Sequence, residues 1–161
     1  MTKYSIGQKV MHPLHGIGTV ESIEEKNVLG KTSCYSEIYF SSERLKLMVN
    51  LDSESNMIRS LISKDEIPDI LKVMKSSNND LSVRASERFN INMKKIKSAD
   101  IYMMAEVVKD LSDLKKCKKL SCKEETMLKQ TKKILSSELS YVSDMPQEDA
   151  EMMIEQMVKT E

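Results

Sequence analysis

The apolar residues of this chain change their spacing near residue 63, and this change constrains the fold more than any other feature. Before it, two kinds of side chain alternate along the chain, as in residues 34–41, where Cys34, Ser36, Ile38 and Phe40 occupy every second position. This two-residue period is typical of a half-buried β-strand. After it, apolar residues recur every three or four positions, as in residues 101–111, which is the period of a helix buried on one face. A chain of 161 residues with this pattern is expected to fold in two parts.

Residues 1–62 predict five short strands, at about 8–11, 15–23, 34–41, 45–50 and 57–61. Val20 and Ile23 do not alternate strictly, which predicts a bulge or strong bend near Glu21 and Ser22. Five short strands in so few residues are typical of a small, strongly bent β-barrel. The expected fold class is therefore α+β, with this barrel followed by an all-helical domain of about five helices.

Two sequence signals mark helix starts in residues 63–161. Ser63 with Glu66, and again Ser121 with Glu124, have the spacing of a capping box, in which each side chain satisfies backbone groups at the helix start. The lysine-rich stretch 115–120 is expected to be a loop, and the last helix is expected after Pro146. The stretch 115–120 would then separate the helix expected to include residues 101–111 from the helix that begins after Ser121.

Few polar groups are arranged for catalysis. His12 and His15 are the only histidines and flank Pro13 at a bend, which favours a turn or a structural hydrogen bond. Cys117 and Cys122 lie five positions apart without a second Cys or His pair that would complete a four-ligand zinc site. With four glycines in all, the chain has no Gly-rich phosphate loop. We expect no catalytic residue, no metal and no cofactor. The alternative, a small metal-dependent hydrolase, would require stoichiometric metal in the purified protein.

Composition also indicates where such a chain resides. No stretch approaches the roughly 20 apolar residues of a membrane span, and residues 1–10 lack the apolar segment of a secretory signal. Three cysteines, odd in number and sparse, fit reduced thiols. We therefore expect a cytoplasmic protein with no membrane contact. Its thirteen methionines fit either flexible core filler or an adaptable binding face.

Charge is unevenly distributed, although the formal net charge of the chain is zero. Residues 82–133 carry fourteen Lys or Arg and seven Asp or Glu, a net of +7, whereas residues 134–161 carry one Lys and seven acids, a net of −6. A basic block followed by an acidic end suggests a polyanionic partner. Solvated helix faces that neutralise each other would give the same counts.

The helix expected at about 81–97 carries the most suggestive set of basic residues. At about 100° per residue, Arg84, Arg88 and Lys95 fall within about 40° of one another, and Lys94 and Lys97 extend the charge to the opposite flank. Such a face can contact phosphates, and ordinary solubilising charge is the alternative. The core face is expected to hold Leu81, Ala85, Phe89, Met93 and Ile96.

Three stretches together resemble the CarD/CdnL family of bacterial transcription regulators. The first is residues 6–20 (IGQKVMHPLHGIGTV), in which a Gly precedes a strand and a Pro-x-His-Gly turn leads to the next. The second is residues 98–100 (SAD) with 105–111 (AEVVKDL). The third is residues 120–121 with Glu124, 127–128 and 134–139 (ILSSEL). Their order and spacing match across nearly the whole chain.

The resemblance implies a Tudor-like β domain, residues 1–62, that binds the β subunit of RNA polymerase. It also implies a helical domain, residues 63–161, that contacts promoter DNA, independently of sequence, at the upstream edge of the transcription bubble. No reaction is catalysed, and the protein shifts the equilibrium between closed and open promoter complexes. We expect a monomer or a weak dimer, domain-swapped or not. The implied polymerase-binding residues are Lys26, Tyr39, Lys46 and Met48. The DNA-binding residues expected from the charge pattern and the resemblance are Arg84, Arg88, Lys94, Lys95, Lys97, Lys129 and Lys132.

Three positions depart from the family pattern. Ala85 lies where many relatives carry a Trp that acts as a wedge at the bubble edge, and Ala cannot hold a base step unstacked. Met48 lies where some relatives have Arg, and Glu125 where relatives can have Lys. The resemblance thus implies polymerase docking with DNA held mainly through charge. The alternative is a protein–protein adaptor that uses a β edge for strand addition and never touches DNA.

Overall fold

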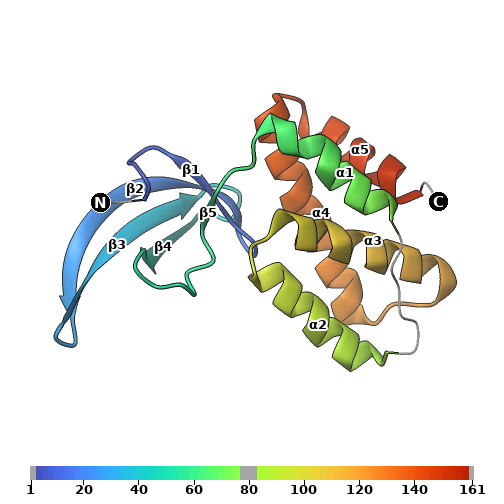
Figure 1. Cartoon of the computed structure of the whole chain (residues 1–161), viewed down its shortest axis with the longest axis horizontal. Coiled ribbons are helices and arrows are strands. Elements are labelled where there is room, and N and C mark those ends of the chain that lie inside the picture. The colour runs from blue at the N-terminus through green and yellow to red at the C-terminus, as the bar shows by residue number, and fades with distance from the viewer. Residues whose placement is uncertain (1–2, 77–82, 160–161) are drawn as a thin grey trace. The chain divides into compact units, whose positions relative to one another are not determined.

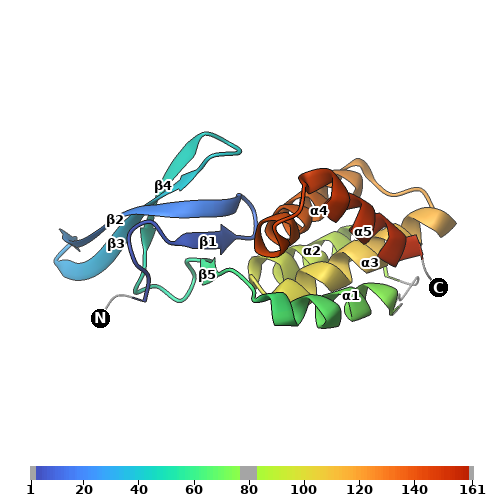
Figure 2. The same cartoon turned by 90° about the horizontal axis from the view of Figure 1, so that it is seen from above.

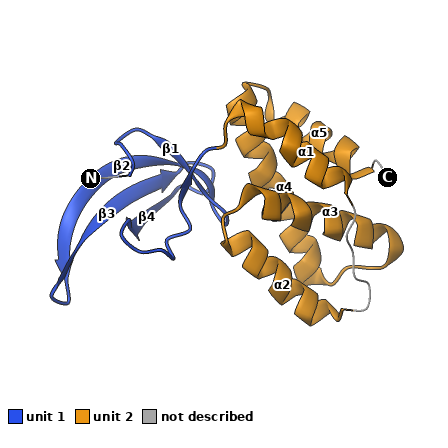
Figure 3. Cartoon of the chain, viewed as in Figure 1, with its two compact units in different colours: residues 1–61 blue, residues 62–161 orange. Residues whose placement is uncertain are grey.

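The computed structural model describes residues 3–76 and 83–159, and the chain divides into two compact units (Figure 3). The first unit is Met1–Leu61 and the second is Ile62–Glu161. Each unit has its own cluster of buried apolar side chains. The described fold is α+β, as predicted from the change in apolar spacing.

The first unit is one antiparallel sheet, in the order β4-β3-β2-β1-β5 (Figures 1 and 2). Its strands are β1 (Lys9–His12), β2 (Gly16–Val28), β3 (Lys31–Phe40), β4 (Leu45–Asn50) and β5 (Arg59–Ser60). The prediction of five strands is confirmed, but the sheet is open rather than a closed barrel. β5 has two residues, which pair only with Val10 and Met11, so among the described residues β4 and β5 remain edge strands.

The β2–β3 hairpin forms the centre of this unit and is strongly bent (Figure 1). The predicted bulge is present, because the pairing register of β2 with β3 shifts between Val20 and Ser22. Ile38 and Phe40 are fully buried beside β2. A Cβ atom on Gly18 would lie 2.6 Å from Ile38 Cγ2, so only Gly permits this close packing.

The two histidines have a structural role, as expected. His12 is buried, and its Nδ1 accepts a hydrogen bond from the Leu14 N–H at 3.1 Å. Burial, reinforced by the neighbouring His15, lowers the pKa of His12 to about 4. His15 Nδ1 lies 2.8 Å from a Glu43 carboxylate oxygen. The His12 imidazole therefore stabilises the turn between β1 and β2, and His15 joins this turn to the one between β3 and β4.

Five α-helices are described in the second unit: α1 (Ile67–Lys75), α2 (Ala85–Lys97), α3 (Ile101–Cys117), α4 (Cys122–Ser143) and α5 (Gln147–Lys159). A short 3-10 helix, Lys64–Glu66, precedes α1. Both predicted capping boxes form, at Ser63 with Glu66 and at Ser121 with Glu124. α3 packs against each of the other four helices and so forms the centre of this unit (Figure 1).

Two predictions about the helices are wrong. Residues 115–117 were expected in a loop but continue α3, because Lys is a good helix former and Leu114 is buried. Ala85 was expected in the core but is exposed; it is the first residue of α2, one turn before the partly buried Phe89. Leu81, expected on the same face, lies outside the described residues. Phe89 and Met93 pack against the core as expected.

Candidate docking face and nucleic-acid interface

The sheet brings the four residues expected to bind a protein partner to one face. Tyr39 pairs with Lys46, and Glu37 pairs with Met48, and directly opposed residues project to the same side of a sheet. Lys26 pairs with Ser33, which is an even number of positions from Tyr39 and therefore shares that side. We call the face that carries Lys26, Tyr39, Lys46 and Met48 the docking face. Lys26 lies about 20 Å along the hairpin from Tyr39, at roughly 3.3 Å per residue.

The lysines of the docking face have acidic neighbours. Lys46 Nζ lies 3.2 Å from a Glu21 carboxylate oxygen and 3.4 Å from one of Glu37. The hydrogen bond to Glu21, and then the charges of both carboxylates, raise the pKa of Lys46. Lys26 Nζ is 3.9 Å from Glu24. Met48, 49% exposed, adds an apolar contact beside these charges. The face therefore combines an aromatic ring, a thioether and partly neutralised lysines.

The backbone of β4 offers a second means of binding. The Leu51 N–H donates to the Cys34 carbonyl at 2.8 Å, and these two residues continue the β3–β4 register. Hydrogen-bonded pairs alternate along an antiparallel ladder, so Leu47 and Val49 bond inward to β3. The N–H and C=O groups of Lys46 and Met48 consequently point to the free edge of β4. A partner strand could add at this edge.

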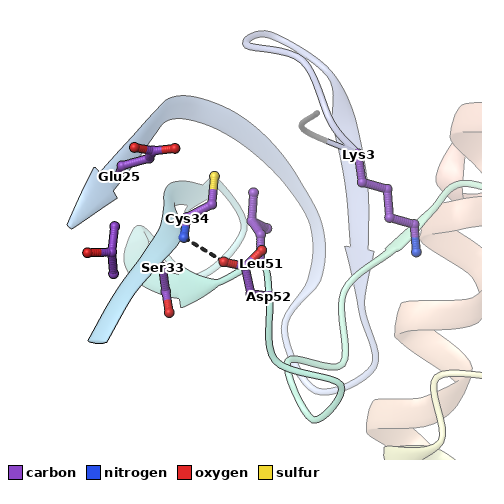
Figure 4. A pocket seen from close by; sticks show the side chains of 7 residues that line it. Lys3, Glu25, Ser33, Cys34, Leu51 and Asp52 are labelled. Atoms are coloured by element: carbon purple, nitrogen blue, oxygen red, sulfur yellow. Dashed lines mark hydrogen bonds between the residues drawn. The ribbon is translucent and has the colours of Figure 1, made fainter. Parts of the chain in front are cut away.

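A cavity of about 230 Å³ in the first unit (Figure 4) is lined by none of the four docking residues, although Ser33, the ladder partner of Lys26, is part of its wall. An Asp52 carboxylate oxygen accepts a hydrogen bond from the Cys34 N–H at 2.8 Å at its wall. No His is among the described residues that line it, which are Lys3, Glu25, Thr32, Ser33, Cys34, Leu51 and Asp52. This lining gives no pairing of a nucleophile with an imidazole base.

Two kinds of feature are absent from residues 3–76 and 83–159. No group of three or more His, Cys, Asp or Glu side chains there could hold a metal ion. None of the helices in these two stretches has both the length and the apolar character needed to cross a membrane.

The most strongly held basic side chain of α2 is Arg88. Its Nε and Nη2 donate to the two Glu124 carboxylate oxygens at 2.6 and 2.9 Å, and its Nη1 donates to the Val83 carbonyl at 3.0 Å. This forked pair, with Glu124 fully buried, ties the start of α2 to the start of α4. In this structure the guanidinium of Arg88, expected to contact DNA, is used within the protein.

Glu124 serves two partners at once. Besides Arg88, its carboxylate accepts hydrogen bonds from the Ser121 N–H at 3.3 Å and the Ser121 hydroxyl at 3.1 Å. Burial alone would raise the pKa of Glu124, but the bonds from Arg88 and Ser121 outweigh it and hold the pKa below its usual value. The sequence predicts the capping-box role of Glu124, but nothing in the local pattern points to a partner 36 positions away.

The other basic residues of α2 divide by exposure. Lys95 is half-buried, with its Nζ 3.4 Å from a Glu106 carboxylate oxygen of α3. Lys94 and Lys97 are exposed on the solvent side of α2, as is Ile91, which is 48% exposed; Arg84, the extended residue just before the helix, is exposed as well. We call Arg84, Ile91, Lys94 and Lys97 the α2 basic face. This face places positive charge at the surface, and positive charge of this kind can contact phosphates.

The structure does not bring Lys129 and Lys132 to the α2 basic face. Glu124 marks the side of α4 that meets α2, and Lys129 and Lys132 lie about 140° and 80° around the helix from it. Lys132 Nζ lies 2.6 Å from a Glu155 carboxylate oxygen of α5. Both lysines line a groove with Glu151, Ile154 and Glu155. They therefore belong to a second surface, between α4 and α5.

Comparisons with known proteins match both units. The model of the family described as "CarD, C-terminal domain" matches residues 69–155, and that described as "CarD-like/TRCF RID domain" matches residues 4–62. A protein of Bacillus subtilis (strain 168), described as "Putative transcription factor YdeB", is 32% identical over 140 residues. That match covers 86% of this chain and 92% of the relative.

Proposed function

We propose that this chain, which belongs to the CarD-like family and is a transcription regulator, docks on the RNA polymerase β subunit and contacts promoter DNA near the upstream edge of the transcription bubble. A domain of the CarD-like/TRCF RID type interacts with RNA polymerase, which supports a partner in the transcription machinery. The β subunit and promoter DNA are the finer assignments of this proposal. No catalysed reaction is part of it.

Polymerase docking is supported above all by the convergence of the four expected residues on one face. Tyr39, Met48 and Lys46 come from two neighbouring strands, and the strand that carries Met48 is an edge strand. Side-chain contacts and backbone pairing can therefore act on the same partner segment. A partner strand along β4 would lie next to Lys46 and Met48, whose backbone groups face that edge.

DNA contact is supported by the α2 basic face. Arg84 and Lys94 are exposed, and phosphate contacts of this kind hold a duplex without reading its sequence. Ala85 is exposed at the first residue of α2, beside Arg84, where many relatives carry the Trp wedge. With Ala at this position, the bubble edge is held by charge rather than by an inserted ring.

The regulatory effect then follows from differential binding. A protein that binds the open promoter complex more tightly than the closed one shifts the population toward the open state. A tenfold shift corresponds to about 1.4 kcal/mol of differential binding. A few charge contacts at the edge of the melted region are sufficient for an effect of this size.

Titration of purified RNA polymerase with the full chain tests the docking. We expect binding at micromolar concentration or tighter, and at least tenfold weaker binding for Met48→Glu and Tyr39→Ala. Met152→Glu, which changes an exposed Met of α5, is the matched control and should leave the affinity unchanged. Absence of wild-type binding at micromolar concentration would overturn the docking proposal.

A second candidate function is favoured by the free edge of β4. The chain could act as an adaptor that captures a partner strand at this edge and makes no DNA contact. Combined charge reversal of Arg84, Lys94 and Lys97 separates the two functions. Loss of the regulatory effect on a promoter supports DNA contact, whereas an unchanged effect supports the adaptor.

A further inference from the structure

The tip of the β2–β3 hairpin has an unusual residue in its turn. Val28 and Lys31 are the last pair of the ladder, so Leu29 and Gly30 form the two-residue turn. Their φ angles are 52° and 81°. Two consecutive residues with positive φ are the signature of a type I′ turn, in which Asn, Asp or Gly normally occupies the first position.

Leu29 is unfavourable at this position for two separate reasons. The left-handed region is strained for a residue with a Cβ, and Leu has no short polar side chain that would relieve the strain. The side chain is also fully exposed, with a relative exposure of 102%, and the neighbouring Val28 is 47% exposed. Leu29 is part of neither buried cluster of the protein. Neither local conformation nor core packing therefore explains a Leu at this tip.

The tip continues the docking face. Alternation along the ladder places Val28 and Lys31 on the same side as Lys26, and therefore on the same side as Tyr39 and Met48. β4 pairs with β3 only from Tyr35 onward, and β1 pairs with β2 only up to Thr19. Among the described strands the outer half of the hairpin is thus a two-stranded arm, with no strand beside it.

The chemistry of the arm defines what fits it. Its end presents two adjacent apolar side chains, Val28 and Leu29, flanked by the ammonium groups of Lys26 and Lys31. An apolar pocket would bury the first pair, and carboxylates on the rim of that pocket would meet the second. Lys31 is eight positions from Tyr39, at most about 26 Å along the strand. One partner surface of ordinary interface size can span both.

We propose that Val28 and Leu29 form an apolar anchor that inserts into an acid-rimmed apolar pocket on the RNA polymerase β subunit that the docking face binds. This inference rests on the proposed function and extends its contact area to the hairpin tip. The strain at Leu29 is explained because the turn projects the side chain away from the sheet, where only a partner can bury it.

Titration of purified RNA polymerase with full-length variants tests the anchor. Leu29→Asn removes the apolar side chain and introduces a residue that tolerates the left-handed conformation of the turn. We expect its affinity to fall at least tenfold while its melting temperature stays equal or rises. Ile6→Asn, at another exposed apolar residue of the same unit, is the matched control and should bind as the wild type does.

The outcomes distinguish the anchor from the docking proposal. If Met48→Glu weakens binding and Leu29→Asn does not, the anchor is wrong and the docking face stands. If Leu29→Asn and Ile6→Asn weaken binding equally, the loss is not specific to the tip and the anchor is also overturned. If the wild type does not bind the polymerase, the docking proposal fails and the anchor with it.

Discussion

The Arg88–Glu124 ion pair has a structural role: it holds the start of α2 in place. Its forked hydrogen bonds join α2 to α4, and Glu124 is fully buried, so the pair fixes the start of α2. Removing one member of such a pair leaves the other charge without its partner in a poorly solvated place. Arg84 and Ala85, which lie next to this end of α2, are thereby held in place.

Glu124→Ala should therefore destabilise the helical unit. We expect the free energy of unfolding to fall by about 3 kcal/mol, near the lower end of the range for broken buried pairs because Arg88 keeps some solvent contact. Urea denaturation followed by circular dichroism measures this change. Glu125→Ala, on the same turn but exposed, is the control and should cost less than about 1 kcal/mol. Equal losses for the two variants would contradict the structural role of the pair.

Asp110 makes the stability of the fold fall as pH rises, whereas an ordinary paired carboxylate makes stability rise with pH. Burial, reinforced by Glu106 and Asp113 and opposed by Lys95, raises the pKa of Asp110 to about 6. The folded chain therefore holds a proton that the unfolded chain releases between about pH 4 and pH 6, and the contribution of Asp110 to stability is lost as pH rises through this window.

Asp110→Asn should remove this dependence. We expect the slope of unfolding free energy against pH, between pH 4 and pH 6, to become more positive in the variant, because the group that favours the folded state at low pH is gone. Urea denaturation at several pH values measures the slope. Gln130→Ala, at an exposed residue without a titratable side chain, should leave the slope unchanged. An unaltered slope in Asp110→Asn would refute the assignment.

At the scale of elements, the contact of β2 with β3 organises the first unit. Gly18 lets β2 approach the side chains of Ile38 and Phe40, and the bulge after Val20 bends the hairpin. The docking face is the other side of this same hairpin. Its geometry therefore depends on the packing of residues on the opposite, buried side of the sheet.

Gly18→Ala tests this dependence. The new methyl group would lie within 2.7 Å of Phe40 Cε1, so side chains or backbone must shift, at a cost of about 1–3 kcal/mol. Thermal unfolding measures the loss. Asn27→Ala, at an exposed position of the same strand, should change stability by less than about 0.5 kcal/mol. A Gly18→Ala variant as stable as the wild type would contradict the close packing of β2 against Ile38 and Phe40.

Local signals predicted most elements, and long-range contacts account for what they missed. Both capping boxes and the bulge at Val20 involve residues within a few positions of one another, so the sequence shows them directly. The pairing of Arg88 with Glu124 joins two helices and leaves no periodic trace. The sequence did not show that the sheet is open, because this follows from how few residues of β5 pair. It did not show where α3 ends, because the charged run there suits a helix as well as a loop.

The α2 basic face predicts a measurable salt dependence of DNA binding. Loss of one phosphate contact lowers the slope of log K against log salt concentration by about 0.9 for duplex DNA. We expect this decrease for Arg84→Gln and for Lys94→Gln, measured by fluorescence anisotropy across a salt series. Lys129→Gln, on the second surface between α4 and α5, is the control and should keep the wild-type slope. A smaller slope for Lys129→Gln alone would indicate that DNA contacts the surface between α4 and α5 instead of the α2 basic face.

At the scale of the whole molecule, the proposed function assigns a separate task to each of the two units. Each has its own buried cluster, so a surface change in one unit is expected to leave the other folded. The docking face lies in the first unit and the α2 basic face in the second. Under the proposed function, regulation would require both in one chain, because docking on the polymerase would raise the local concentration of weak DNA contacts.

The lifetime of open promoter complexes, measured with and without the full chain, tests this account most directly. We predict that the wild type changes the lifetime, that Met48→Glu removes the effect at concentrations where the wild type is saturating, and that Arg84→Gln combined with Lys94→Gln removes it even when the variant is bound to polymerase. An effect that survives loss of the α2 charges at full polymerase occupancy would contradict the account.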